Sequence, residues 1–283
     1  MNLKSIFVFF LAISSIQLMY SQQLMIPRAS SKALISQTVG VCSISVEYGR
    51  PSVRNRAIFS KLVPYEKVWR AGANEATTIT FDHPINFEGK SVAAGKYGLF
   101  MIPRKDSWTI ILNKDWSQWG AYNYDSTDDV LRVNVKPTSN ELTELCTYSF
   151  VGVTKIEGIL RLEWETSKVD IKISTATNKH TLQDIDLVLN RAKENWYSFS
   201  AAAQYHFYEL KETEKALEYI DVAIALAAPN PSPWMLKSQI LASQGQYTEA
   251  IHFAEMAIDV CKEHDFSYEV HENEENILKW KMK

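Results

Sequence analysis

The sequence is poor in several features that would point to a particular activity. It has three cysteines among 283 residues and a formal net charge of −3, from 30 basic and 33 acidic residues. A near-balanced charge argues against a nucleic-acid binder, which normally carries a basic surface. Beyond the N-terminus no apolar run approaches the roughly 20 residues that a membrane-spanning helix needs, so we expect no membrane span in the mature chain.

Motifs for catalysis and metal binding are also missing. The chain has no GxSxG sequence, no phosphate-binding loop, no Cys/His couple, no CxxC and no His/Cys spacing of a zinc site. His83 precedes Pro84 in an expected turn, and His206, His252 and His264 lie on expected helices, where solvated or hydrogen-bonded histidines are the ordinary case. The sequence therefore predicts no catalytic residue, no cofactor and no metal site.

The cysteines leave two alternatives open. Cys42 lies in "CSISVEY" and Cys146 in "CTYSF", and in both segments the alternation turns the cysteine toward a core. The two residues either form a disulfide or remain buried thiols that act as small apolar side chains. Cys261 lies on an expected helix, and we expect it to be free.

The N-terminus has the pattern of a signal peptide. Lys4 precedes the apolar run "IFVFFLAI", and Ser21 is a small residue suited to cleavage before Gln22. A membrane anchor is the alternative, but the run is too short to span a bilayer. We therefore expect residues 1–21 to be a signal peptide and the protein to be periplasmic or secreted.

Residues 22–174 have the pattern of a β domain. In "VLRVNVK", "ILRLEWE" and "KVDIKI" apolar and polar residues alternate, which is typical of half-buried strands. Turn sequences recur between these segments, as in an antiparallel sandwich or barrel. The fold class that we expect is α+β and multidomain, an antiparallel β-sandwich followed by an α-helical domain.

Residues 175–283 have a helical period and an internal repeat. A helix is expected over residues 181–196, with Thr181 at its start. Ala216 and Ala250 are 34 residues apart, as are Ala223 and Ala257, which is the period of tetratricopeptide repeats. The unit 231–264 resembles such a repeat closely, whereas the unit 197–230 has Lys211 where a glycine is usual, so its first helix is doubtful. We expect a tetratricopeptide-like domain that binds a protein or peptide partner, with a helical bundle lacking a peptide groove as the alternative.

Four motifs over residues 35–173 resemble a known bacterial family. They are "YGRPSVRNR", "LVPYEKVWRAGANEAT", "AGKYGLF" and "NKDWSQWGAYNYDSTDDVLRV". They are similar to the family called domain of unknown function 2911, apart from Asn55, which replaces an expected glycine and tolerates the same backbone. The resemblance implies a fold, an exported location and frequent C-terminal helical repeats, but no reaction.

The polar residues of these motifs are the candidate site. They are Arg50, Arg70, Asn74, Glu75, Trp119, Tyr122 and Tyr124. Three interpretations stay open: a hydrogen-bonded structural corner, a site for a sugar or a peptide carboxylate held by arginine, or a glycan hydrolase that uses Glu75 with Asp125. We expect a non-catalytic binding or scaffolding protein of the bacterial envelope, with the hydrolase as the alternative. In the expected site Arg70 and Glu75 form the floor, Trp119 or Tyr122 forms the wall, and Gly72 allows a sharp backbone turn.

Overall fold

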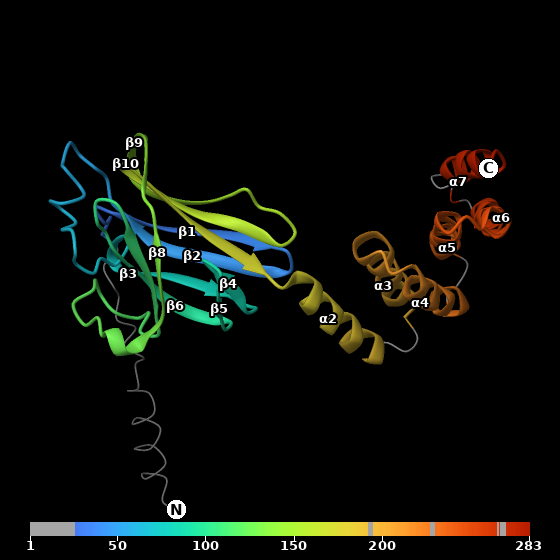
Figure 1. The fold of residues 1–283 in the computed structure, drawn as a ribbon, viewed down its shortest axis with the longest axis horizontal. Helices are drawn as coiled ribbons and strands as arrows, with labels where there is room; N and C mark the ends of the chain where they lie inside the picture. The colour runs from blue at the N-terminus through green and yellow to red at the C-terminus, as the bar shows by residue number, and fades with distance from the viewer. Residues whose placement is uncertain (1–25, 192–194, 227–229, 265, 267–269) are drawn as a thin grey trace, which may run out of the picture. The chain divides into compact units, whose positions relative to one another are not determined.

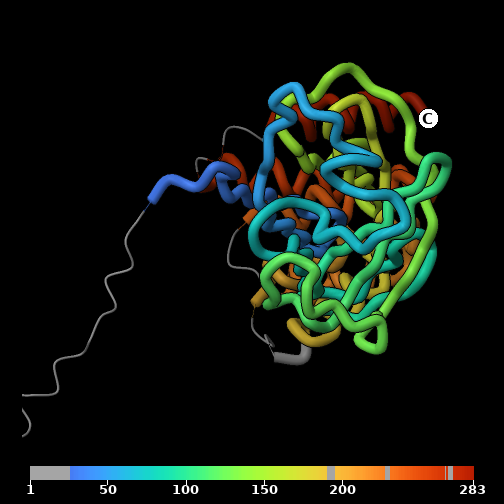
Figure 2. Tube along the Cα trace, turned by 90° about the vertical axis from the view of Figure 1, so that its left-hand side faces the viewer, coloured from blue at the N-terminus to red at the C-terminus, as the bar shows by residue number. Residues whose placement is uncertain are grey.

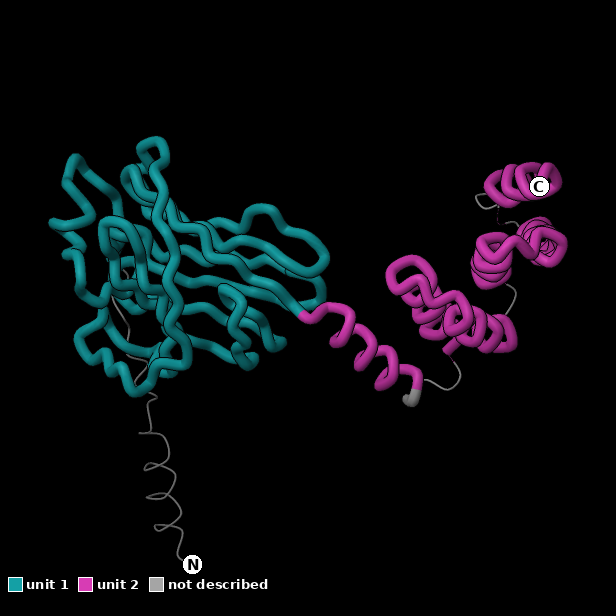
Figure 3. Tube along the Cα trace, viewed as in Figure 1, with its two compact units in different colours: residues 1–175 teal, residues 176–283 magenta. Residues whose placement is uncertain are grey.

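The computed structural model describes residues 26–191, 195–226, 230–264, 266 and 270–283. The signal peptide expected over residues 1–21 lies outside this range. The chain divides into two compact units, one ending at Thr175 and one beginning at Ala176 (Figure 3).

The first unit consists of two antiparallel sheets (Figure 1), and Figure 2 shows the chain trace turned by 90°. The six-stranded sheet has the order β1-β2-β3-β6-β7-β8, and the four-stranded sheet has the order β5-β4-β10-β9. In chain order the strands are β1 (Ser31–Val39), β2 (Cys42–Arg50), β3 (Ala73–Phe81), β4 (Ile85–Phe87), β5 (Lys90–Val92), β6 (Gly95–Ile102), β7 (Trp108–Asn113), β8 (Asp129–Val135), β9 (Thr138–Val151) and β10 (Glu157–Thr175). The α+β fold class, with a β-rich region before the helices, is confirmed.

One apolar core is shared by the two sheets. The alternating residues predicted to face inward are buried in both: Ile44 and Val46 of β2, and Leu162 and Ile171 of β10, are at most 1% exposed. Cys42 and Cys146 are buried free thiols, so the structure has the second of the two alternatives, without a disulfide. The long segment between β2 and β3 contributes to the same core, and Asn55 within it has the positive φ of 55° that was expected of its turn.

The second unit is helical. Its helices in the described residues are α2 (Thr177–Arg191), α3 (Trp196–Tyr205), α4 (Thr213–Leu226), α5 (Pro231–Ser243), α6 (Tyr247–His264) and α7 (Val270–Trp280). The expected helix start at Thr181 is wrong, because β10 ends at Thr175 and α2 begins two residues later. The expected helix end at residue 196 is also wrong, since Asn195 caps a new helix there by accepting a hydrogen bond from the Tyr197 N–H. None of the described helices is long and apolar enough to cross a membrane.

The 34-residue repeat corresponds to two helix pairs, α3 with α4 and α5 with α6. Ala216, Ala223, Ala250 and Ala257 are fully buried between packed helices. The first helix of the first pair, which was doubtful from the sequence, is present and continues as a π-helical turn over His206–Leu210. Lys211 then adopts the left-handed conformation, with a φ of 61°, that Gly245 adopts at the matching position of the second pair.

Candidate functional site

The corner that leads into β3 is anchored by Trp69. This side chain is buried, and its indole Nε1 donates to the Gly72 carbonyl at 3.1 Å. Its backbone exchanges two hydrogen bonds with Met101 of β6, and its ring stacks on Trp164 of β10 at 5.8 Å between centroids. Trp69 therefore fixes the chain on the core immediately before Arg70.

The sharp turn occurs at Ala71 rather than at Gly72. Ala71 has a φ of 54°, and its carbonyl accepts hydrogen bonds from the Thr77 and Tyr148 hydroxyls at 3.0 and 2.9 Å. Gly72 is required for a different reason, because a Cβ atom there would lie 2.7 Å from Thr77 Oγ1 and 2.9 Å from the Gly49 carbonyl oxygen. The expectation that Gly72 provides the turn is wrong; this glycine lets β2 and the corner approach closely.

The two motif segments meet at this corner. The Ala76 N–H donates to the Gln118 carbonyl and the Gly120 N–H donates to the Asn74 carbonyl, both at 3.0 Å. Glu75 and Trp119 form an isolated antiparallel bridge between these bonds. Strand β3 begins at Ala73, which pairs with Gly49 of β2, and the segment 118–120 pairs with the residues that follow.

Arg70 and Glu75 are not paired with each other. Arg28 Nη1 lies 2.6 and 2.8 Å from the two carboxylate oxygens of Glu75, and its guanidinium lies over the Trp119 ring at 5.8 Å. Both charged side chains of this pair are about half exposed. The hydrogen bond from Arg28 lowers the pKa of Glu75, although partial burial opposes the shift.

Arg70 instead lines a small pocket of about 210 Å³ together with Lys67, Ala121 and Tyr122. The apolar part of the lining is formed by Leu62, Val63, Pro64, Val68 and Trp69. The Nε atom of Arg70 is buried and has no hydrogen-bond partner in the described part of the chain. Burial lowers the pKa of Arg70, opposed only by the nearby Tyr122. A guanidinium in this state is poised to receive an acceptor from a ligand.

The remaining predicted residues are held by bonds within the protein. Asn74 has a φ of 64° and donates from Nδ2 to the Ser30 carbonyl at 3.1 Å. Arg50 donates to the Cys146 carbonyl and to Thr147 Oγ1, which ties β2 to β9. Tyr124 donates to the Asp129 carboxylate, accepts from Arg132 and packs edge-on against Phe100. Neither Arg50 nor Tyr124 belongs to the pocket lining.

The carboxylates proposed for a hydrolase are engaged elsewhere. Asp125 accepts a hydrogen bond from the Thr127 N–H at 2.8 Å, which caps a short 3₁₀ turn and lowers the pKa of this carboxyl group. The pKa of Glu75 is also lowered. A glycosidase acid needs a raised pKa, so neither carboxyl group has the electrostatic environment of that role.

Two contributors to this region were not found from the sequence. Arg28 lies before the first strand, and Lys67 lies in the irregular segment before β3. Neither segment has a periodic hydrophobic pattern from which the contacts of its residues could be predicted. Ser30 and Arg28 reach the corner because the chain passes it before entering β1. Apart from this corner, Cys42, Asp82 and His83 place potential metal-ligand atoms close together.

Comparison with known proteins gives a family but no activity. No curated protein matches the chain. Among solved structures, the one titled "TPR2B-domain:pHsp70-complex of yeast Sti1" is 16% identical over 35% of this chain and 79% of that chain, and its TM-score of 0.34 is too low to carry an argument about fold. The family described as "Protein of unknown function (DUF2911)" matches residues 30–173, just over half of the chain, and the protein therefore belongs to this family.

Proposed function

We propose that the β unit binds a small carboxylate-bearing group in the pocket beside Arg70. One observation carries the proposal: Arg70 lines the pocket, and its buried Nε has no acceptor among the residues that the structure describes. Removing a donor from water without a partner costs about 1–3 kcal/mol, and a ligand carboxylate would supply that partner bidentately. Tyr122, which is 82% exposed, offers an aromatic wall beside it.

The pocket volume limits the ligand. At about 210 Å³, the pocket lies below the roughly 300–1,000 Å³ that holds a drug-sized molecule. It therefore suits the end group of a larger molecule, such as a peptide C-terminus or a uronic acid unit of a glycan. Both share the carboxylate that Arg70 would recognise.

Binding without catalysis is the role that this chemistry favours. The pocket lining contains Arg70, Lys67 and Tyr122 but no carboxylate, histidine, cysteine or serine. The hydrolase alternative has no comparable support, because Glu75 is paired with Arg28 and Asp125 caps a turn. We further propose export to the periplasm or cell surface, supported by the N-terminal pattern of residues 1–21.

For the helical unit we propose a protein or peptide partner. The support is the 34-residue repeat, which forms two helix pairs packed through buried alanines. Stacked helical repeats usually present an extended binding surface. Cross-linking of the exported protein in cells, compared with a chain ending at residue 175, tests this. Cross-linked partners that persist without the helices would contradict it.

The carboxylate proposal is tested by paired ligands and paired variants. N-acetylated amino acids and glucuronate are titrated into the protein by NMR, alongside the corresponding amides and glucose. The variant is Arg70→Met, and the matched control is Arg104→Met, whose arginine pairs with exposed Glu66. Loss of a charge-assisted hydrogen bond of about 1.5–3 kcal/mol corresponds to roughly 10- to 150-fold weaker binding.

We expect carboxylates to bind, their neutral analogues to bind weakly, and Arg70→Met alone to abolish the difference. The ligand that binds identifies the source of the carboxylate. Equal binding of acids and amides, or unchanged binding by Arg70→Met, would show that the proposal is wrong.

A further inference from the structure

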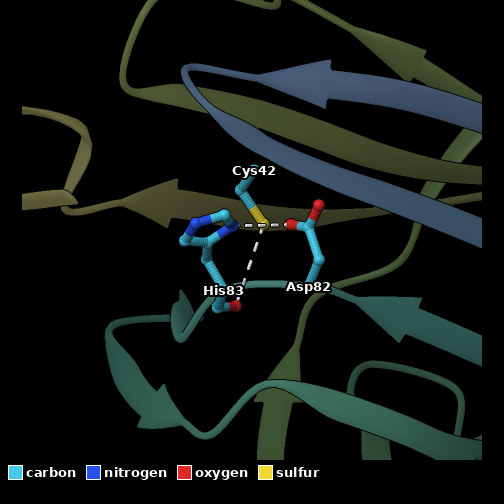
Figure 4. Close-up of side chains that lie close together, drawn as sticks. All are labelled: Cys42, Asp82 and His83. Carbon is cyan, nitrogen blue, oxygen red and sulfur yellow. Dashed lines mark hydrogen bonds and ion pairs between the residues drawn. The ribbon is translucent and has the colours of Figure 1, made fainter. Parts of the chain in front are cut away.

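Three side chains with metal-binding chemistry meet at one end of the six-stranded sheet. Cys42 is the first residue of β2, and Asp82 and His83 directly follow the last residue of β3. Because β2 and β3 are antiparallel, with Ile44 opposite Phe81, the start of one strand lies beside the end of the other. Figure 4 shows the three side chains turning toward one another from these two strand ends.

Their donor atoms are close enough to share one ion. The Cys42 Sγ, an Asp82 carboxylate oxygen and a His83 ring nitrogen all lie within 4.8 Å of one another. In the part of the chain that the structure describes, no other group of three such residues does so. With zinc–sulfur bonds of about 2.3 Å and zinc–nitrogen or zinc–oxygen bonds of about 2.0–2.1 Å, tetrahedral ligand atoms lie about 3.3–3.7 Å apart. Small side-chain rotations would bring the three atoms to that spacing.

The surrounding backbone holds this group in place. Cys42 is paired with Val39 across the β1–β2 turn, and the Ser43 N–H donates to Asp82 Oδ1 at 2.9 Å. His83 Nδ1 lies 2.8 Å from the same Asp82 oxygen, so the imidazole and carboxylate already orient each other. The strand ends and the Ser43 N–H therefore hold the three side chains near one another, as a metal site requires.

Burial divides the group into an inner and an outer part. Cys42 is fully buried, whereas the side chains of His83 and Asp82 are 39% and 54% exposed. An ion would therefore approach from solvent past the imidazole and carboxylate and meet the sulfur beneath them. The exposed side leaves room for a water molecule as a fourth ligand.

The donor set of the group suits a cation. It offers a carboxylate, a ring nitrogen and a thiol from which a metal ion displaces the proton.

We propose that Cys42, Asp82 and His83 bind a divalent transition-metal ion such as zinc through thiolate, carboxylate and imidazole. As the metal binds, the thiol proton passes to solvent, and the hydrogen bond between His83 and Asp82 is exchanged for bonds from both groups to the metal, with the ring proton carried by the other imidazole nitrogen. Sulfur and nitrogen ligands select zinc or cobalt over magnesium and calcium, which prefer oxygen alone. Three protein ligands and one open position make the site suited to an exchangeable ion rather than a closed structural one.

Cobalt titration tests this site directly. The purified protein, freed of metal and kept reduced, is titrated with Co²⁺ while the thiolate-to-cobalt charge-transfer band and the ligand-field bands are recorded. Zn²⁺ is then added to displace the cobalt. The variants are Cys42→Ser and His83→Gln, and the matched controls are Cys261→Ala and His271→Gln, in which the substituted residues lie in the helical unit.

We expect the wild type and both controls to show a saturating charge-transfer band with four-coordinate ligand-field intensity, lost when Zn²⁺ is added. Cys42→Ser should lose the band, and His83→Gln should bind Co²⁺ at least tenfold more weakly while keeping the wild-type circular dichroism. His83→Gln keeps the test decisive if Cys42→Ser fails to fold. A wild type without the band, a band lost in Cys261→Ala instead, or unchanged affinity in His83→Gln would overturn the proposal.

Discussion

Replacing Gly49 by alanine tests the close approach that builds the corner before β3. Gly49 lies opposite Ala73 in the β2–β3 ladder, next to a shift in register. A Cβ atom at residue 49 would lie 2.0 Å from the Ala73 carbonyl oxygen and 2.7 Å from its carbon. These atoms belong to the backbone of β3, so no side-chain rotation relieves the contact. The strands must separate, or the corner must shift.

The loss of stability expected for Gly49→Ala follows from this rigid backbone contact. Overpacking a close-packed interior typically costs about 1–3 kcal/mol, and the upper end applies where backbone is displaced. For a unit of about 150 residues each kcal/mol lowers the Tm by roughly 2–4 °C, so a cost of about 3 kcal/mol corresponds to about 6–12 °C. Since Ala73 follows Arg70 by three residues, the same displacement should also weaken ligand binding in the Arg70 pocket.

Thermal unfolding followed by near-ultraviolet circular dichroism measures the effect. The matched control is Gly158→Ala, because a Cβ atom at this buried position of β10 would meet the Val153 and Val39 methyl groups at an ordinary 3.4 Å. We expect Gly158→Ala to melt close to the wild type. If Gly49→Ala melts within about 2 °C of the wild type, or if both variants fall equally, the steric argument for this corner is wrong.

Four further predictions concern other parts of the molecule. Glu75→Gln should lower the free energy of unfolding at neutral pH by about 0.2–1 kcal/mol. Because pairing with Arg28 lowers the pKa of Glu75, the difference in unfolding free energy between variant and wild type should vanish as the pH falls through that lowered pKa. Denaturant unfolding of both proteins at a series of acidic pH values measures this difference. A reductant should leave the Tm unchanged, since Cys42 and Cys146 are free thiols. A disulfide between them would close a loop of about 100 residues and contribute about 4.7 kcal/mol to stability, so a steep fall of the Tm in reductant would contradict this. Lys211→Gly should raise the stability of the helical unit by up to about 1 kcal/mol in urea unfolding, because lysine is strained at a φ of 61°, and a loss of stability would contradict this. A fragment ending at Thr175 should fold by itself, as circular dichroism would show; a fragment that stays unfolded would show that the two units are one folding domain.

The strands of the first unit were largely predictable because alternation is a local property. Leu131, Val133 and Val135 of β8 face the core as their spacing indicates, and the same holds for β2 and β10. The helix pairs were predictable from the 34-residue repeat, since buried alanines recur at equal intervals. The π-helical turn before Lys211 was not, because the sequence there lacks the glycine that usually ends the helix.

The candidate site was predictable as a place but not as a set of contacts. Backbone pairing does bring Asn74 to Gly120 and Glu75 to Trp119, as the clustered motifs suggested. The partner of Glu75 was missed because Arg28 is 47 residues away and belongs to no periodic segment. Cys42 and His83 were missed for a related reason: their meeting depends on the register of β2 with β3, which are separated by 22 irregular residues.

The placement of the tryptophans gives this protein two separate optical signals. Trp69 and Trp164 are stacked at an interplanar angle of 19°, with Trp108 edge-on to Trp69 at 6.3 Å, so their transitions couple and report the integrity of the β core. Trp119 is 54% exposed beneath Arg28, beside the segment that carries Tyr122 into the pocket, and its emission responds to solvent and charge there. Near-ultraviolet ellipticity therefore reports loss of packing in the β core, whereas red-edge fluorescence of the same unlabelled sample reports the exposed tryptophans, Trp116 at 42% and Trp119 at 54% exposed.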